Sequence, residues 1–283
     1  MISVNGVEIK PQKFPDGTKK IDVGEVPGTI KWNSFNSYGV KWLYESDDEL
    51  FLVYCISKTL KTIDPDIRQH LTMPYIPNAR FDRIEYSDEC FTLKYFAEII
   101  NSLNFERVIV RDPHSNVSKA LFNNVVEEDV CCTYIPEVID KIVEVEDCFD
   151  NLVIYFPDNG SLKRYGANTL DYIDRNIPIV YGVKNRDWKT GEILGIEIHG
   201  QTDKLNENTV ILMIDDICSK GGTFYYGSKE LEKYGCKTMY LYVTHCENTI
   251  LEGNLLKEDS LFKKVFTTNS IFTAEHEKVE VLR

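Results

Sequence analysis

Two adjacent carboxylates and a loop of small residues give this sequence its clearest chemical signal. Asp215 and Asp216 follow the apolar run Val210 to Ile214 and precede the loop Ser219-Lys220-Gly221-Gly222-Thr223. Backbone N–H groups in such a loop, at the start of a helix, favour a phosphate group. Carboxylates repel a phosphate but accept hydrogen bonds from hydroxyl groups. The pattern therefore predicts a ribose-phosphate site, with Asp215 and Asp216 on the sugar hydroxyls and the loop on the 5-phosphate.

The elements around this motif must place it at the edge of an open α/β sheet. The apolar run predicts a buried central strand, and residues 224–233 predict the helix that follows the loop. Ligands of such sheets bind outside the carboxyl ends of the strands. The alternative is an ordinary strand, turn and helix with solvated acids. Adjacent aspartates after a strand are common, but the pair followed by Ser-Lys-Gly-Gly-Thr is much less so, and we favour the sugar-phosphate site.

Composition narrows the class of protein. The 283 residues are 43% hydrophobic and 27% charged, which is typical of a globular protein. The formal net charge of −13 argues against a nucleic-acid partner or an anionic membrane surface. We find neither an apolar run of membrane-spanning length nor a signal-peptide pattern. The eight cysteines include no Cys-x-x-Cys pair, and we expect reduced thiols in a cytoplasmic protein.

Segments along nearly the whole chain resemble the ribose-phosphate pyrophosphokinases (PRPP synthetases), and the central loop resembles that of the phosphoribosyltransferase fold. The segments that carry the resemblance are Lys13-Phe14-Pro15-Asp16-Gly17-Thr18, Pro74-Tyr75-Ile76-Pro77-Asn78-Ala79-Arg80-Phe81-Asp82-Arg83, Asp112-Pro113-His114-Ser115, Pro157-Asp158-Asn159-Gly160-Ser161 and Lys184-Asn185-Arg186. Each is a weak signal alone, whereas their order and spacing together are specific. The departures from the family pattern are Thr18 for Glu, Phe81 for Gln, Pro113, Asn185 and Lys220.

The resemblance assigns an ATP site to the first half of the chain. It implies that Phe14 stacks on adenine and that Asp16 faces the edge of the base. It also implies that Arg80 binds the ATP phosphates, with Asp82 and His114 nearby. From the residues alone, the charged cluster around Arg80 could equally be solvated surface.

The resemblance implies a Mg²⁺ cofactor and a cationic catalytic loop. His114 and Asp158 match the family's metal ligands, and both follow predicted strands. Lys184 and Arg186 match the two residues that act on the transferring phosphates. The helix predicted after Asp158 also carries Arg164, which we interpret only as a solvated charge.

The fold that the resemblance implies is α/β, with two tandem phosphoribosyltransferase-like domains, each a mainly parallel sheet flanked by helices. We place the first domain at residues 1–149, with the ATP-site elements but without a phosphate loop. The second spans residues 150–283 and contains the ribose-phosphate loop. The resemblance also implies a homo-oligomer, a dimer or larger.

The reaction that the resemblance implies is transfer of the β,γ-diphosphate of ATP to the C1 hydroxyl of ribose 5-phosphate, giving PRPP and AMP. The departure at Lys220 leaves a second acceptor open, because extra positive charge would suit a 5-diphosphate ester such as ADP-ribose, as in NAD salvage. The alternative is that the Lys220 side chain points to solvent and has no specific role. A phosphoribosyltransferase and a non-catalytic regulatory homologue also remain open.

Overall fold

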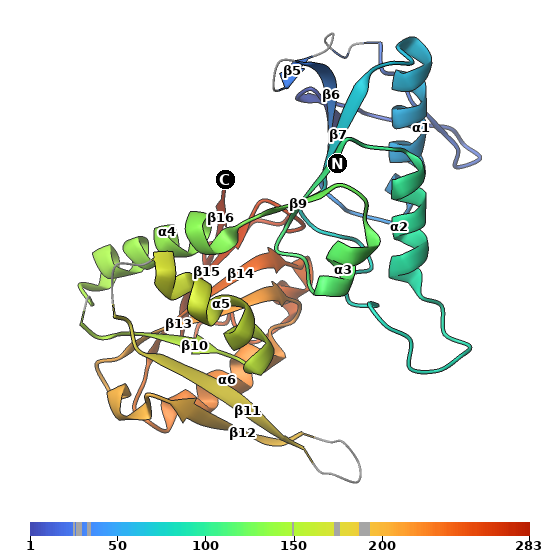
Figure 1. Ribbon diagram of the computed structural model, residues 1–283. Coiled ribbons are helices and arrows are strands. Elements are labelled where there is room, and N and C mark those ends of the chain that lie inside the picture. The colour runs from blue at the N-terminus through green and yellow to red at the C-terminus, as the bar shows by residue number, and fades with distance from the viewer. Residues whose placement is uncertain (25, 27–29, 33–34, 149, 173–175, 187–192) are drawn as a thin grey trace. The chain divides into compact units, whose positions relative to one another are not determined.

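The helices and strands of the protein form two α/β units, Met1–Glu128 and Asp129–Arg283 (Figure 1). The structure is a computed structural model that describes residues 1–283 apart from 25, 27–29, 33–34, 149, 173–175 and 187–192. The division falls earlier than the boundary predicted at 149/150. The helix α4 (Val130–Glu146) accounts for the difference, because its buried face shares a core with the strand β10 (Leu152–Phe156) of the second unit.

The first unit is built on a mixed sheet in the order β2-β1-β6-β7-β8-β9, with β5 also paired to β6. Its strands are β1 (Ile2–Val4), β2 (Val7–Glu8), β5 (Ile30–Trp32), β6 (Phe35–Trp42), β7 (Arg68–Thr72), β8 (Arg107–Arg111) and β9 (Val125–Glu128), with a separate hairpin of β3 (Gln12–Lys13) and β4 (Lys19–Lys20). The run from β6 to β9 is parallel. The helices are α1 (Asp48–Ile63), α2 (Thr92–Ser102) and α3 (Asn116–Leu121).

The second unit is built on a sheet in the order β12-β11-β10-β13-β14-β15-β16. Besides α4 and β10 its elements are α5 (Asn159–Tyr172), β11 (Ile179–Arg186), β12 (Ile193–Gly200), η1 (Thr202–Lys204), β13 (Val210–Cys218), α6 (Gly222–Glu232), β14 (Thr238–Cys246), η2 (Asn248–Glu252), β15 (Phe262–Thr268) and β16 (Val279–Leu282). Neighbouring strands are parallel except for the β11–β12 hairpin. The predicted mainly parallel sheet is confirmed.

The central strand β13 is apolar throughout its first half because helices cover both faces of the sheet. Its side chains alternate between the faces, as strand geometry requires. Leu212 and Ile214 pack in the core that contains α4, whereas Ile211 and Met213 pack in the core that contains α6. Figure 1 shows α4 and α5 on one side of this sheet and α6 on the other. No helix in the described part of the chain is long and apolar enough to cross a membrane.

Candidate active site

The two aspartates lie inside β13 rather than after it. The strand continues through Cys218 because its ladder with β14 extends to the pair Cys218 and Cys246. Asp216 is buried, and its Oδ2 lies 3.3 Å from Nη1 of Arg164 on α5. The carboxyl end of β13 therefore carries an acid that a cation from the covering helix already contacts.

Asp215 occupies a site crowded with negative charge. Burial raises its pKa well above the ordinary value, and the neighbouring charges of Asp216 and Asp158 raise it further. Its Oδ1 accepts a hydrogen bond of 3.0 Å from the backbone N–H of Asp216. Asp158 follows β10, which pairs in parallel with β13, so Asp158 and Asp215 belong to the same edge of the sheet.

The loop after β13 depends on two glycines for its path. Gly221 has a φ of +78°, in the left-handed region, and it caps α6, which begins at Gly222. A Cβ on Gly221 would overlap the side chain of Leu255, and a Cβ on Gly253 would overlap the carbonyl oxygen of Lys220. The segment after β14 thus packs directly against the loop. The first N–H groups of α6 point out of the helix end, where helices leave them without intrahelical acceptors, so the loop retains the geometry of a phosphate cradle.

Lys220 forms an ion pair at the surface of this loop. Its Nζ lies 2.7 Å from Oε2 of Glu252 in η2, and the two side chains are 65% and 61% exposed. The side chain is thus exposed, but its charge is offset by a carboxylate. This arrangement gives no specific support to the idea that Lys220 supplies charge for a second phosphate.

Asp158 lies just beyond β10 and shapes the start of α5. Its Oδ1 accepts hydrogen bonds from the backbone N–H groups of Gly160 (2.9 Å) and Ser161 (3.1 Å). These bonds fix the carboxylate near the edge of the sheet. The described residues contain no group of three or more His, Cys, Asp or Glu side chains arranged to hold a metal ion.

The predicted catalytic cations fall at the end of β11. Lys184 and Arg186 belong to the last residues of this strand, which pairs in parallel with β10. Their side chains, and residues 187–192, lie outside the described residues. The strand β12 returns antiparallel to β11, so the two strands form a hairpin.

The predicted ATP-site residues all lie in the first unit. Phe14 is exposed in the β3–β4 hairpin, next to Asp16. The pKa of Asp16 is lowered by the hydroxyl of Thr18, which donates a 2.7 Å hydrogen bond to Oδ1, and by the N–H of the same residue. His114 is half-buried between β8 and α3.

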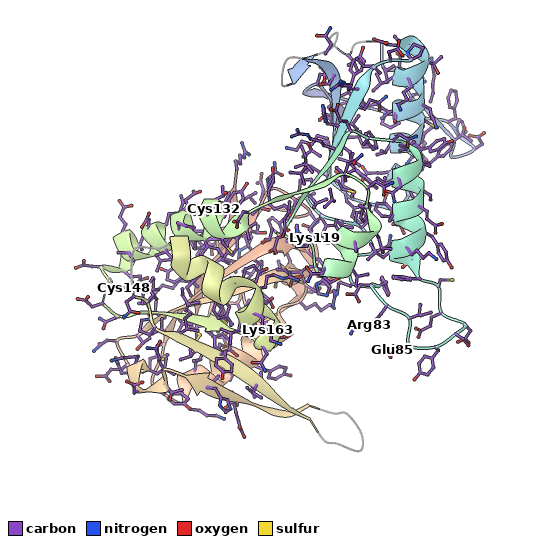
Figure 2. The ribbon with its side chains drawn as sticks, viewed as in Figure 1. Arg83, Glu85, Lys119, Cys132, Cys148 and Lys163 are labelled. Carbon is purple, nitrogen blue, oxygen red and sulfur yellow. The ribbon has the colours of Figure 1, made fainter. Side chains whose placement is uncertain are left out.

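The segment between β7 and α2 contains the other predicted ATP ligands. Arg80 is exposed, and Oδ1 of Asp82 lies 3.7 Å from Nε of Arg83. Figure 2 shows Arg83 on this loop, with Glu85 close by in the sequence. Phe81, which replaces the family's Gln, is 61% exposed. These residues are available to a ligand, but their role stays a prediction.

Sequence reasoning missed two residues of the second unit. Arg164 was assigned to solvent, because nothing in a helix sequence shows that Asp216 lies opposite. The other is Tyr155 of β10, whose buried hydroxyl has no hydrogen-bond partner among the described residues. A tyrosine within an apolar strand is a possible signal, since a buried hydroxyl normally has a partner.

Comparisons with known proteins point to one family. No protein-family model matches the chain. Ribose-phosphate pyrophosphokinase 2 of Schizosaccharomyces pombe is 30% identical over 206 residues, which are 70% of this chain and 59% of that protein. Ribose-phosphate pyrophosphokinase 1 of Candida albicans is 26% identical over 234 residues, 80% of this chain and 66% of that protein. The chain thus spans about three-fifths to two-thirds of the length of these relatives.

A solved structure shares the fold. The crystal structure of phosphoribosylpyrophosphate synthetase from Mycobacterium smegmatis matches with a TM-score of 0.74 and 15% identity, covering 97% of this chain and 85% of that one. At this identity the likeness shows the fold alone. It confirms the predicted pair of α/β domains with mainly parallel sheets.

Proposed function

The chain belongs to the ribose-phosphate pyrophosphokinase family, and from this premise we propose that it transfers the β,γ-diphosphate of ATP to the C1 hydroxyl of ribose 5-phosphate. The products are PRPP and AMP. The observation that supports the proposal most strongly is the carboxyl edge of β10 and β13. Two strand-borne aspartates and the small-residue loop lie on one continuous segment there, and Asp158 lies just beyond the neighbouring parallel strand β10.

This edge of the sheet can bind both the 5-phosphate and the hydroxyl groups of a sugar phosphate. The N–H groups of the loop and of the first turn of α6 suit the 5-phosphate, and the hydroxyl of Thr223 adds a donor. The Asp215 and Asp216 carboxylates suit the ribose hydroxyls as acceptors. A sugar bound at both ends presents its C1 hydroxyl in a fixed direction, and positioning of this kind lowers the barrier to a displacement at phosphorus.

The transfer itself needs charge neutralisation more than covalent chemistry. Lys184 and Arg186 are proposed to act on the transferring phosphates, because they end the strand next to β10. We assign no general base, since a loose transition state demands little proton removal before the bond to the leaving AMP breaks.

A divalent cation is part of the proposal. Asp158 fits Mg²⁺ in its chemistry, because Mg²⁺ takes oxygen ligands. The pKa of Asp215 is raised first by burial and then by the charges of Asp216 and Asp158, and a cation at this edge would offset those charges. We retain Asp158 as a proposed ligand, and His114 stays an expectation from the resemblance. When bound with ATP, Mg²⁺ supplies charge neutralisation on the β- and γ-phosphates.

The first unit is proposed to bind ATP. Phe14 is exposed and can stack on adenine, while the hydrogen bonds from Thr18 keep the Asp16 carboxylate in place as an acceptor for the base. Arg80 is proposed to bind the phosphates. The assembly is proposed to be a homo-oligomer, which light scattering on the purified protein would measure.

The acceptor assay tests the proposal. The protein is incubated with ATP and Mg²⁺, and with ribose 5-phosphate, ADP-ribose or no acceptor, and phosphorus NMR follows AMP and the new C1 diphosphate ester. We expect AMP release that depends on ribose 5-phosphate and on Mg²⁺. Absence of AMP with both acceptors would refute a pyrophosphokinase. AMP release only with ADP-ribose would show that ADP-ribose, and not ribose 5-phosphate, is the acceptor. Consumption of PRPP with a nucleobase would indicate a phosphoribosyltransferase instead.

A further inference from the structure

The two aspartates of β13 have different surroundings although they are adjacent in sequence. Asp215 is flanked by Asp216 in the strand, and burial together with the charges of Asp216 and Asp158 raises its pKa. Asp216 instead contacts the guanidinium of Arg164 across 3.3 Å, and its side chain is only 9% exposed. The two carboxylates therefore lie in different electrostatic environments.

The Arg164 side chain contacts an aromatic ring of its own helix, α5. Its guanidinium carbon lies 5.7 Å from the ring centre of Tyr165, and that buried ring stacks on Phe156 at the end of β10. The Arg164 side chain is 29% exposed. Lys163, the preceding residue on α5, is exposed (labelled in Figure 2).

We propose that Arg164 is a positioning residue of the ribose-phosphate site, which holds the Asp216 carboxylate so that it accepts a hydrogen bond from a sugar hydroxyl. The proposal rests on the proposed function of this edge. Arg164 acts through Asp216, and contact with the substrate belongs to Asp216.

The physical argument starts from the cost of burying a charge. A nearly buried ion pair adds little to stability compared with an apolar pair, because removing both charges from water offsets their attraction. Stability alone is therefore a weak reason for this pair. Its place at the carboxyl edge gives a second reason, since a carboxylate fixed by a planar guanidinium loses little orientational freedom when a hydroxyl binds.

The experiment compares three variants with the wild type. Arg164→Met removes the charge and keeps much of the length, Arg164→Lys restores a charge without the fork, and Lys163→Met removes a neighbouring charge from the same helix. A charge-assisted hydrogen bond contributes about 1.5–3 kcal/mol, which is about 10- to 150-fold. We expect Arg164→Met to raise KM for ribose 5-phosphate by about that factor, with KM for ATP changed less than about twofold. Arg164→Lys should recover part of the loss, and Lys163→Met should behave as wild type.

A double-mutant cycle separates positioning from simple loss of structure. Ribose 5-phosphate binding is measured by calorimetry without ATP for Arg164→Met, Asp216→Asn and the double variant, alongside thermal unfolding. We expect the double variant to bind about as weakly as Asp216→Asn alone. Additive losses, equal effects on both substrates, or a loss explained by unfolding would overturn the proposal. A wild-type protein that binds no ribose 5-phosphate would refute the proposed function, and this inference with it, whereas wild-type binding that Arg164→Met leaves unchanged refutes the inference alone.

Discussion

Replacing Gly182 by Ala should introduce a local clash beneath the proposed site. Gly182 lies in β11, where a Cβ would stand 2.6 Å from the hydroxyl oxygen of Tyr155 and 2.8 Å from the carbonyl oxygen of Pro157. Ordinary carbon–oxygen contacts begin at roughly 3.3 Å, so these neighbours must give by about 0.7 and 0.5 Å. Overpacking of this kind costs about 1–3 kcal/mol. The alanine also lowers the conformational entropy of the unfolded chain, which stabilises the protein by about 0.4–1 kcal/mol. We therefore expect the free energy of unfolding to fall by about 1–2 kcal/mol in total.

Tyr155→Phe removes one of the two clashing atoms and makes the reasoning testable. The hydroxyl is buried without a partner among the described residues, and it also fits closely against Gly227 of α6. An unpartnered buried hydroxyl is unfavourable, so Tyr155→Phe alone should leave stability unchanged or raise it by up to about 1 kcal/mol. In the double variant the shortest contact of the alanine at 182 is removed, while those with the Pro157 carbonyl oxygen and with Cγ2 of Ile196 at 3.1 Å remain. We expect a coupling of about 0.5–1.5 kcal/mol between the two changes.

Urea unfolding measured by circular dichroism gives the free energies for this cycle. Gly195→Ala is the matched control, because a Cβ at Gly195 in β12 would meet nothing within 4 Å, and it should not lower stability by more than about 0.5 kcal/mol. Strictly additive losses from Gly182→Ala and Tyr155→Phe would refute the steric argument. A clear loss from Tyr155→Phe alone would show that the hydroxyl has a partner in solution.

Three further changes test other contacts. Burial raises the pKa of Glu146, but the hydrogen bonds from Lys263 and Tyr240 outweigh burial and leave this pKa below its ordinary 4.5. The stability that the ionised Glu146 contributes is therefore present above pH 4.5 and lost as the pH falls through the lowered pKa. Glu146→Gln should thus make the unfolding free energy less dependent on pH in this range. Lys184→Ala should abolish AMP release and leave ATP binding by calorimetry largely intact, and unchanged turnover would refute its role. Glu252→Gln should change the unfolding free energy by less than about 1 kcal/mol, because its pair with Lys220 is exposed; a larger loss would show that the pair braces the loop.

The central strand shows what a local pattern can and cannot predict. The apolar run Val210 to Ile214 predicted a strand buried on both faces, and β13 confirms it. The end of the strand was not predictable, because a ladder ends where its partner ends. β14 continues to Cys246, and this pairing draws Asp215 and Asp216 into β13. The sequence thus predicted the acids and the loop but not the backbone conformation of the acids.

The division between the two units falls before the boundary at 149/150 for a similar reason. The helix α4 has an apolar face, and its sequence does not show which of the two sheets covers that face. In the structure Ile135, Val138 and Ile142 share a core with β10. A contact of this kind joins residues that no local composition connects, and the structure groups α4 with the second unit whereas the boundary at 149/150 groups it with the first.

Lys220 and Arg164 show that the role of a charged residue is hard to predict when its ion-pair partner is unknown. Lys220 drew attention as extra positive charge in the phosphate loop, yet Glu252 offsets it. Arg164 was assigned to solvent, yet it contacts a buried acid. If Lys220 is neutralised, a phosphate in the loop must be held mainly by the N–H groups at the start of α6 and by the Thr223 hydroxyl. Such donors suit one phosphate group at a fixed distance from the aspartates. By this reasoning we expect the loop to bind a monophosphate sugar better than an ester with a second phosphate, and the acceptor assay with ribose 5-phosphate and ADP-ribose measures the difference.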